Sequence, residues 1–281
     1  MTRSVSCCCE DTSMLVLIRG AGDLASGIAL RLHHAGFSVV MTDLPRPTSI
    51  RRTVSFSEAI CLGSTRVEDV SAEYATDCPS ALALLRRGII PVLADPEAAC
   101  REALQPDALV DAILAKRNLG TRITDAPVVI GVGPGFTAGV DCHAAVETMR
   151  GHDLGRALYT GSPQPNTNIP GLIGGFAGER VLRAPADGLF EPTAEIGDFV
   201  ESGQIAGYVA GKPMACTISG VLRGLIRGGT PVFAGMKCGD VDPRGKKDYC
   251  YRVSDKALAI GGGVLEAMLR IGGSAWKNKS N

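Results

Sequence analysis

The sequence has no long hydrophobic run and no excess of one charge. No stretch approaches the roughly 18 consecutive apolar residues that a membrane span needs, and no long apolar segment near the N-terminus is typical of a secretory signal. Lysine plus arginine and aspartate plus glutamate number 29 each, so the formal net charge is zero. Without an excess of positive charge, the chain has no general attraction for nucleic acid or anionic membranes. We therefore predict a cytoplasmic protein that binds neither.

The ten cysteines include no C-x-x-C pair, the spacing typical of zinc sites and dithiol redox sites. In an intracellular chain of this size the default state of a cysteine is a free thiol. Cys7, Cys8 and Cys9 are consecutive in a polar leader, and adjacent cysteines do not easily converge on one tetrahedral metal. We expect residues 1–13 to be a disordered leader. Met14 is an alternative start, because the folded pattern begins there.

Apolar residues and glycine are abundant. Apolar residues make up 45% of the 281 residues, enough for one large domain or, as we expect, two. Glycine accounts for 35 residues, well above its usual share of about 7%. The change of pattern along the chain predicts a nucleotide-binding domain over residues 14–176, a β-rich module over 177–255, and a C-terminal helix and tail over 256–281.

A glycine-rich turn lies between a short apolar run and an amphipathic helical pattern. Residues 14–18 resemble a buried parallel strand, and Gly20, Gly22 and Ala25 then fit the G-x-G-x-x-G/A pattern. The first glycine permits a tight turn, the second lets the backbone approach a phosphate, and the small third residue lets helix and strand pack. A second apolar run leads to Asp43, 21 residues after Gly22, where a carboxylate accepts a ribose hydroxyl. This arrangement predicts a bound nucleotide.

Strand and helix patterns alternate as far as about residue 160. We expect helices over 57–61, 80–87, 96–104 and 137–150, and strands over 37–41, 65–70, 89–94, 108–114, 128–132 and 156–160. Strands that alternate with helices indicate a parallel sheet with helices on its faces. The predicted fold class is therefore α/β, with a Rossmann-like doubly wound parallel sheet followed by the β-rich module.

A second glycine-rich loop, residues 131–143, follows the predicted strand 128–132 and opens a helix. Free N–H groups at the start of the predicted helix 137–150 would form an anion site beside it, although a tight turn without a ligand is an equal alternative. Two such loops in one sheet can flank a ligand crevice. The predicted cofactor-binding residues are Gly20, Ala21, Gly22, Asp23, Leu24, Asp43, Arg46, Gly133 and Gly135. Arg51 and Arg52 join Arg46 as candidate phosphate clamps, because guanidinium groups match phosphate oxygens.

Several polar residues after the second loop allow both a functional and a structural interpretation. His143 and Glu147 would share one face of the predicted helix and, with Asp141, could bind a metal or exchange protons. We favour the structural interpretation and assign no metal site, because spacing supplies no further ligands. Cys142 near the helix start could have a low pKa, although the position also suits a buried residue.

Three other polar loops are less specific. Loop 116–122 is basic and polar and lies at the end of a strand, where Asn118 and Thr121 could bond a ligand. Loop 161–171 is a lid or a connection between domains. Asp240 and Asp242, with two neighbouring cations, are interpreted as part of a salt-bridged turn.

Residues 183–252 are rich in glycine and β-branched residues and show no helical period. Two segments, 184–209 and 215–232, repeat a strand, a turn and a return strand, which is similar to the half-motifs of biotinyl- and lipoyl-type barrel-sandwich hybrids. Lys212 lies near the hairpin tip where such domains carry a modified lysine, but it lacks their flanking residues and is interpreted as an exposed turn lysine. A helix over 256–271 is expected to pack on the first domain.

Four longer motifs resemble a known family. They are residues 18–27, 125–141, 147–156 and 237–244. They resemble the YqeB-type accessory proteins of the selenium-dependent molybdenum hydroxylase system, from about Met14 to Arg270, and leave the leader outside. The first glycine turn is also similar to that of XdhC-type maturation factors for xanthine dehydrogenase, which handle molybdenum cofactor before its insertion. The resemblance implies a pathway more than a reaction.

The leading hypothesis is therefore a maturation factor that binds an NAD(P)-like nucleotide or a molybdopterin dinucleotide. Its implied partners are the molybdenum hydroxylase apoprotein and other cofactor-maturation proteins. The alternatives are an NAD(P)-dependent oxidoreductase, with His143 and Lys116 as candidate catalytic residues, and a non-catalytic interaction protein. The residues leave open whether the chain is an enzyme, whether it forms a homo-oligomer, and whether Cys61, Cys142 or Cys238 transfers sulfur or selenium.

Overall fold

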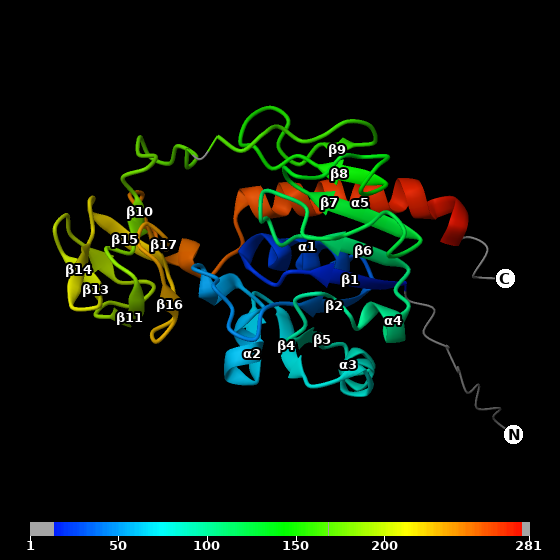
Figure 1. The fold of residues 1–281 in the computed structure, drawn as a ribbon, viewed down its shortest axis with the longest axis horizontal. Coiled ribbons are helices and arrows are strands. Elements are labelled where there is room, and N and C mark those ends of the chain that lie inside the picture. The colour runs from blue at the N-terminus through cyan, green and yellow to red at the C-terminus, as the bar shows by residue number, and fades with distance from the viewer. Residues whose placement is uncertain (1–13, 168, 277–281) are drawn as a thin grey trace, which may run out of the picture.

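The computed structural model describes residues 14–167 and 169–276, so the predicted leader with Cys7, Cys8 and Cys9 lies outside it, as does the end of the predicted tail. A nine-stranded sheet forms the larger part, in the order β3-β4-β5-β2-β1-β6-β7-β8-β9 (Figure 1). The strands are β1 (Leu15–Arg19), β2 (Ser38–Thr42), β3 (Ser64–Val67), β4 (Val70–Ala75), β5 (Ile90–Leu93), β6 (Ala108–Asp111), β7 (Val128–Val132), β8 (Ala144–Val146) and β9 (Ala157–Leu158). From β4 to β8 neighbouring strands are parallel, and the edge strands β3 and β9 are antiparallel.

Helices cover both faces of this sheet. They are α1 (Asp23–His34), α2 (Glu58–Leu62), α3 (Cys78–Leu85), α4 (Arg101–Leu104) and α5 (Asp255–Trp276). Side chains alternate between the faces of a strand, so Val16 and Ile18 of β1 join the core formed with α1 and α5. Leu17 joins the opposite core, formed with α3 and α4. None of these helices, within the residues described, has the length and apolarity that crossing a bilayer requires.

The C-terminal helix packs against α1, as expected from the sequence. Figure 1 shows α5, in red, running alongside α1 over the sheet. The two helices approach closely because small residues meet there: a Cβ on Gly27 would lie 2.5 Å from the Cβ of Ala257. Val253, Ile260 and Val264 complete the same core as β1. Residues near the end of the chain therefore belong to the core that the first strand begins.

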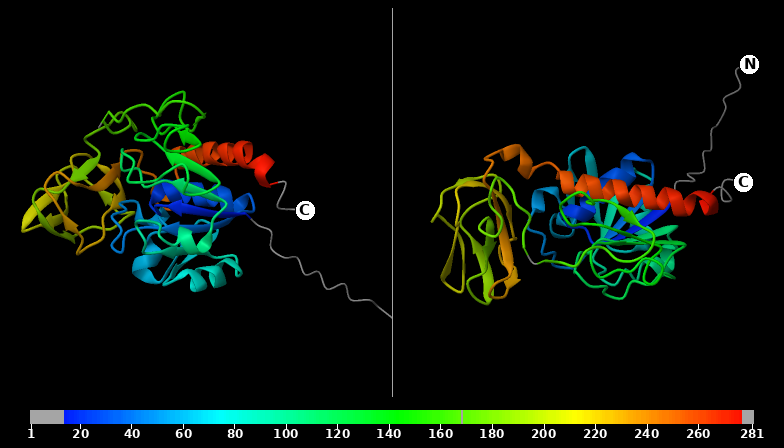
Figure 2. Two further views of the ribbon diagram at one scale, coloured as in Figure 1. Left: turned by 45° about the vertical axis from the view of Figure 1, so that its right-hand side comes forward. Right: turned by 90° about the horizontal axis from the view of Figure 1, so that it is seen from above.

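Residues 181–242 form two four-stranded antiparallel sheets, ordered β10-β17-β15-β12 and β14-β13-β11-β16. The strands are β10 (Val181–Arg183), β11 (Gly188–Pro192), β12 (Phe199–Val200), β13 (Ile205–Val209), β14 (Lys212–Ala215), β15 (Gly220–Leu225), β16 (Pro231–Val232) and β17 (Lys237–Asp242). Leu222 and Val241 from one sheet share a core with Phe190 and Val209 from the other. Figure 2 shows these sheets at one end of the molecule. We call this part the β-module.

A segment after β2 holds the β-module against the large sheet. The Nε of Arg52, in the 3₁₀ turn Arg52–Val54, donates to the carbonyl oxygen of Leu225 over 2.8 Å. The amide of Leu225 in turn donates to the carbonyl oxygen of Ile50 over 2.9 Å. Arg227 forms an ion pair with Glu58 at the start of α2. Both backbone and side chains therefore fix the end of β15 to this segment.

The predicted helix over 137–150 is wrong. Gly133, Gly135 and Gly139 have φ angles of +86°, +107° and +86°, which reverse the chain repeatedly, and β8 then pairs in parallel with β7. All three residues of β8 are buried. A short apolar run that is buried on both faces has no alternation, so periodicity alone cannot distinguish it from part of a helix.

Two further boundaries differ from the sequence prediction. The expected helix over 96–104 is α-helical only over Arg101–Leu104. The expected strand over 65–70 is the hairpin of β3 and β4, which turns at Glu68 with a φ of +55°. A left-handed turn at a non-glycine residue has no strong sequence signal. The other predicted strands of the sheet are present, although several are shorter than predicted.

Candidate functional site

A cleft lies at the carboxyl ends of the central strands, beside the first glycine turn. One part, which we call the turn compartment, has a volume of about 620 Å³ and is lined by the turn and the end of β2. A second part, the basic chamber, has a volume of about 760 Å³ and lies between the large sheet and the β-module. Both are lined by Asp23, Leu24, Ile50 and Lys237. The two parts therefore adjoin one another.

Two glycines of the turn have different roles. Gly20 has a φ of +105°, and a Cβ there would lie 2.8 Å from the carbonyl oxygen of Ala112, so the fold itself requires glycine. Gly22 caps α1 with a φ of −69°, which any residue adopts. A Cβ on Gly22 would meet only the Oγ of Ser49, at 3.4 Å. The fold does not demand glycine at this second position, where the backbone faces the turn compartment.

Asp43 follows β2 and lines the same compartment. Its carboxylate accepts hydrogen bonds from the amides of Ala21, at 2.8 Å, and Leu44, at 2.7 Å. Burial raises the pKa of Asp43, and these two hydrogen bonds oppose that rise. A carboxylate has lone pairs beyond the two used here, so Asp43 can accept a further hydrogen bond from a hydroxyl in the compartment.

Another part of the wall of the turn compartment is supported by Arg19, the last residue of β1. Its buried guanidinium donates to the carbonyl oxygens of Pro96, at 2.9 Å, and Leu119, at 3.1 Å. It also donates to the hydroxyl of Thr121, which itself donates to Asp111 over 2.6 Å. Asn118 accepts from the amides of Gly120 and Thr121. Asn118 and Thr121 therefore support the wall through contacts within the protein.

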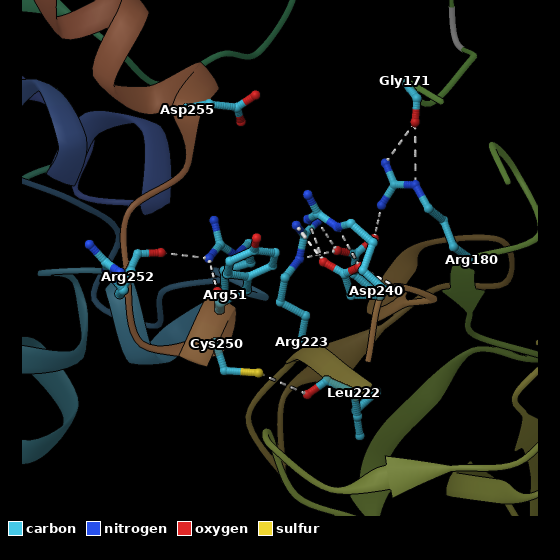
Figure 3. Close-up of polar contacts among 12 residues, drawn as sticks. Arg51, Gly171, Arg180, Leu222, Arg223, Asp240, Cys250, Arg252 and Asp255 are labelled. Carbon is cyan, nitrogen blue, oxygen red and sulfur yellow. Dashed lines mark hydrogen bonds and ion pairs between the residues drawn. The ribbon is translucent and has the colours of Figure 1, made fainter. Parts of the chain in front are cut away.

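The basic chamber is rich in cations. It is lined by the side chains of Arg51, Arg150, Arg180, Arg223, Lys237 and Lys256, against the carboxylates of Asp23 and Asp240. Asp240 is buried and pairs with both Arg180 and Arg223, as Figure 3 shows. Arg223 also lies 3.2 Å from Asp242. The acidic residues thus neutralise only part of the positive charge in the chamber.

Arg51 and Arg52 serve mainly to join parts of the protein, rather than standing free as the expected phosphate clamps. Arg51 donates to the carbonyl oxygens of Tyr249, at 2.8 Å, and Arg252, at 3.1 Å (Figure 3). Arg51 still lines the chamber, and its Nε has no hydrogen-bond partner among the described residues. Arg52 lines neither part of the cleft.

Only some of the other predicted binding residues line the cleft. Gly20, Gly22, Asp23, Leu24 and Asp43 line the cleft, and Ala21 contributes its amide to Asp43. Arg46 is exposed on the loop after β2 and does not line the cleft. A Cβ on Gly135 would lie 2.4 Å from the Cα of Arg117, so packing accounts for that glycine. Gly133 likewise does not line the chamber, although its neighbour Pro134 does.

The residues considered for metal binding or proton transfer have separate structural partners. The Nδ1 of His143 accepts from the amide of Val129 at 3.0 Å, and Asp141 accepts from the amide of Thr137 at 2.8 Å. Glu147 is buried and accepts three backbone amides, from Thr148, Met149 and Gln164. No group of three or more His, Cys, Asp or Glu side chains in the described ranges is placed to hold a metal ion.

The cysteines considered for sulfur or selenium transfer have contrasting surroundings. Cys142 is fully buried and does not start a helix, and burial raises the pKa of its thiol to about 11. Burial also raises the pKa of Cys238. Cys61, in α2, is exposed. The structure therefore contradicts a low-pKa thiol at Cys142, because the helix on which that idea depended is absent.

Sequence reasoning missed Lys237 and Lys256 as candidate binding residues. Lys237 begins β17, Lys256 is the second residue of α5, and both line the chamber. Asp240 and Asp242 form ion pairs as expected, but they belong to strand β17 rather than to a turn. A single lysine at the start of a strand or helix resembles any surface lysine. No local signal distinguishes these two.

The fold and the cleft define a mixed α/β protein with a large sheet, two further antiparallel sheets and a polar cleft between them. No known family profile matches the chain. It is 50% identical over 257 residues to "Uncharacterized protein YqeB" of Escherichia coli (strain K12), which supports a YqeB-type protein. That match covers 92% of this chain and 48% of the relative, so the chain spans about half of the relative's length.

Solved structures show weaker likeness. An aspartoacylase family protein from Mesorhizobium loti is 12% identical, with a TM-score of 0.23, over 52% of this chain and 60% of that one. The ectoine utilization protein EutE from Ruegeria pomeroyi is 11% identical, with a TM-score of 0.22, over 81% and 52% of the two chains. A succinylglutamate desuccinylase/aspartoacylase from Rhodobacter sphaeroides is 14% identical, with a TM-score of 0.24, over 74% and 58%. Scores this low define no common overall fold.

Proposed function

We propose that the turn compartment binds a nucleotide or the dinucleotide form of molybdenum cofactor. The parallel strands β5-β2-β1-β6-β7-β8, taken in chain order, have the 3-2-1-4-5-6 arrangement of Rossmann-like dinucleotide-binding sheets. In such sheets the ligand lies outside the carboxyl ends of the strands where the strand order reverses. That point falls between β1 and β6, and the turn compartment lies there.

The observation that carries the proposal is that Gly22 and Asp43 face one cavity. A phosphate would lie against Gly22 at the N-terminus of α1, where backbone N–H groups and the helix dipole favour an anion. Asp43 would accept a ribose hydroxyl, as carboxylates at the end of the second strand do in this arrangement. Asp23, the first residue of α1, carries a negative charge that would oppose the binding of a phosphate. Arg51 lies 3.6 Å from this carboxylate and offsets its charge.

The proposed cellular role is maturation of a molybdenum hydroxylase. Its support is the resemblance of four motifs to YqeB-type accessory proteins and the identity with the uncharacterized relative. In this role the chain would hold the cofactor and deliver it to the hydroxylase apoprotein. The β-module, with two sheets around one core, would dock that partner in the manner of a barrel-sandwich hybrid. The selenium dependence of the hydroxylase belongs to the same proposal.

Nucleotide binding is tested by mass spectrometry of what co-purifies with the native protein, together with titration of ADP and NAD. A Gly22→Asp variant places a carboxylate where the phosphate would lie, and we expect at least a tenfold weaker affinity, which corresponds to about 1.4 kcal/mol. Gly22→Ala is the matched control for the added charge, because it adds only a Cβ, which the fold tolerates at that position. Equal affinity in the wild type and Gly22→Asp, or no nucleotide bound at millimolar concentration, would contradict the proposal.

A nicotinamide-dependent oxidoreductase is the second candidate, because the strand order and Asp43 favour NAD as much as they favour the dinucleotide form of molybdenum cofactor. Neither of the catalytic residues expected for it lines the cleft: His143 accepts a backbone hydrogen bond, and Lys116 lies in the loop after β6. The two candidates are distinguished by following the absorbance of NADH with small carbonyl substrates. Turnover would favour the oxidoreductase.

A further inference from the structure

Two lysines in the basic chamber differ from every arginine that lines it. Arg150 donates two hydrogen bonds to the carboxylate of Asp255, each over 2.9 Å. Arg180 and Arg223 pair with Asp240, and Arg51 donates to backbone carbonyls. Within residues 14–167 and 169–276, the amines of Lys237 and Lys256 make no hydrogen bond and no ion pair. Each guanidinium group therefore has at least one partner, although the Nε of Arg51 is unpaired, whereas the two amines have all their donors available.

The two lysines come from different parts of the molecule. Lys237 belongs to the β-module through β17, and Lys256 belongs to α5, which packs on the large sheet. Lys237 is open to the solvent in the chamber, but the surrounding walls desolvate its amine and lower its pKa. Desolvation also lowers the pKa of Lys256, and the positive charges of Arg150 and Lys237 contribute in the same direction. The two amines therefore repel one another.

Without a ligand, the repulsion between the two amines is opposed, among the described residues, only by neighbouring carboxylates: Asp23 and Asp240 act on Lys237, and Asp23 and Glu147 act on Lys256. An anion between the amines would replace repulsion by two attractions, and each amine would donate charge-assisted hydrogen bonds to it. A single negative charge would leave much of the surplus positive charge of the chamber in place, because Arg51 also lines the chamber with its Nε unpaired. A dianion with several acceptor oxygens matches the two amines and this guanidinium better.

We propose that the basic chamber is a second binding site, separate from the turn compartment, for a phosphate-type tetrahedral oxyanion held between Lys237 and Lys256. The oxyanion is either free in solution or a phosphoryl group of a larger ligand that enters from the turn compartment, since Lys237 lines both parts of the cleft. Bound there, it would join the β-module to the large sheet. The proposal does not require that a nucleotide occupies the turn compartment.

Titration of inorganic phosphate into the full chain tests this proposal, with isothermal calorimetry for affinity. The resonances of ¹³C-labelled lysine side chains, assigned through the variants, report which amines respond. We expect the signals of Lys237 and Lys256 to move together and to saturate at one phosphate per chain. Lys237→Gln and Lys256→Gln should each weaken binding at least tenfold. Lys212→Gln, at an exposed hairpin position, is the matched control and should bind as the wild type does.

The source of the oxyanion is distinguished by comparing phosphate with ADP. A tenfold loss of phosphate affinity in the lysine variants supports a free oxyanion. The same loss seen only with ADP supports a phosphoryl group that reaches the chamber from the turn compartment. The proposal is overturned if both lysine variants, folded by circular dichroism, bind phosphate and ADP as tightly as Lys212→Gln does. Gly22→Asp should keep its phosphate affinity, so failure of the nucleotide proposal would be recognised separately.

Discussion

Asp240 is the buried carboxylate between Arg180 and Arg223, with an exposed fraction of 1%. Asp240→Asn would leave Arg180 and Arg223 beside a neutral amide whose NH₂ group cannot accept their hydrogen bonds. Removing one partner of a buried pair costs about 3–5 kcal/mol, and we expect a loss of this size in the free energy of unfolding by urea. Asp69→Asn, in the exposed pair with His34, should cost less than about 1 kcal/mol. Equal small losses in both variants would show that Asp240 is not needed for the interior.

The pair between Arg150 and Asp255 gives a prediction about pH. Two hydrogen bonds from Arg150 lower the pKa of Asp255 from 3.8 to about 2, against the opposing effect of burial. Because the folded state has the lower pKa, the pair stabilises the fold above about pH 4. That stability is lost as the pH falls towards about 2.

We expect Asp255→Asn to reduce the free energy of unfolding at pH 7 by less than about 1 kcal/mol, because solvent screens this exposed pair. The difference between the variant and the wild type should shrink as the pH is lowered from about 4 to about 2. Urea unfolding at several pH values measures it. A difference that stays constant over this range would mean that the charge of Asp255 has no effect on stability.

At the scale of elements, two adjacent glycines of α5 have opposite surroundings. A Cβ on Gly262 would meet nothing within 4 Å, whereas one on Gly263 would lie 1.9 Å from the carbonyl oxygen of Gly155. Gly262→Ala should stabilise the protein by about 0.5–1 kcal/mol, because alanine is the better helix former. Gly263→Ala should destabilise it by about 1–3 kcal/mol, because the helix must move away from the loop. Thermal and urea unfolding should show opposite signs, and a shared sign would refute this packing.

The strands and helices also show which sequence signals were sufficient to predict secondary structure. The strands β1, β2 and β7 were predicted because each is a short apolar run ended by glycine or a polar residue. The helix predicted over 137–150 failed because the fully buried β8 has no periodicity of its own, and its neighbour β7 decides its conformation. Partner strands and buried surroundings cannot be inferred from spacing along one segment.

At the scale of the whole molecule, Glu58 connects the two cores. It is buried at the start of α2 and pairs with Arg227 and, at 3.6 Å, with Arg52. Glu58→Gln would remove the charge that both arginines share, so we expect a loss of about 3–5 kcal/mol. Differential scanning calorimetry should then show separate transitions for the large sheet and the β-module. Glu73→Gln, in the exposed pair with Arg87, is the control. A single transition with the wild-type midpoint in Glu58→Gln would contradict this role.

The local features of the candidate site can be predicted from neighbouring residues alone. Gly20, Gly22 and Asp43 were predicted together, because turn chemistry, helix start and strand end depend on neighbouring residues. The contacts of the arginines and lysines follow instead from the packing of distant segments: Arg52 binds the β-module, Arg51 binds the segment between β17 and α5, and Lys237 and Lys256 line one chamber. Those placements depend on how β17, β15 and α5 pack against the segment after β2. Contacts between segments distant along the chain depend on complementary surfaces of the whole fold. Composition and residue spacing therefore do not predict them.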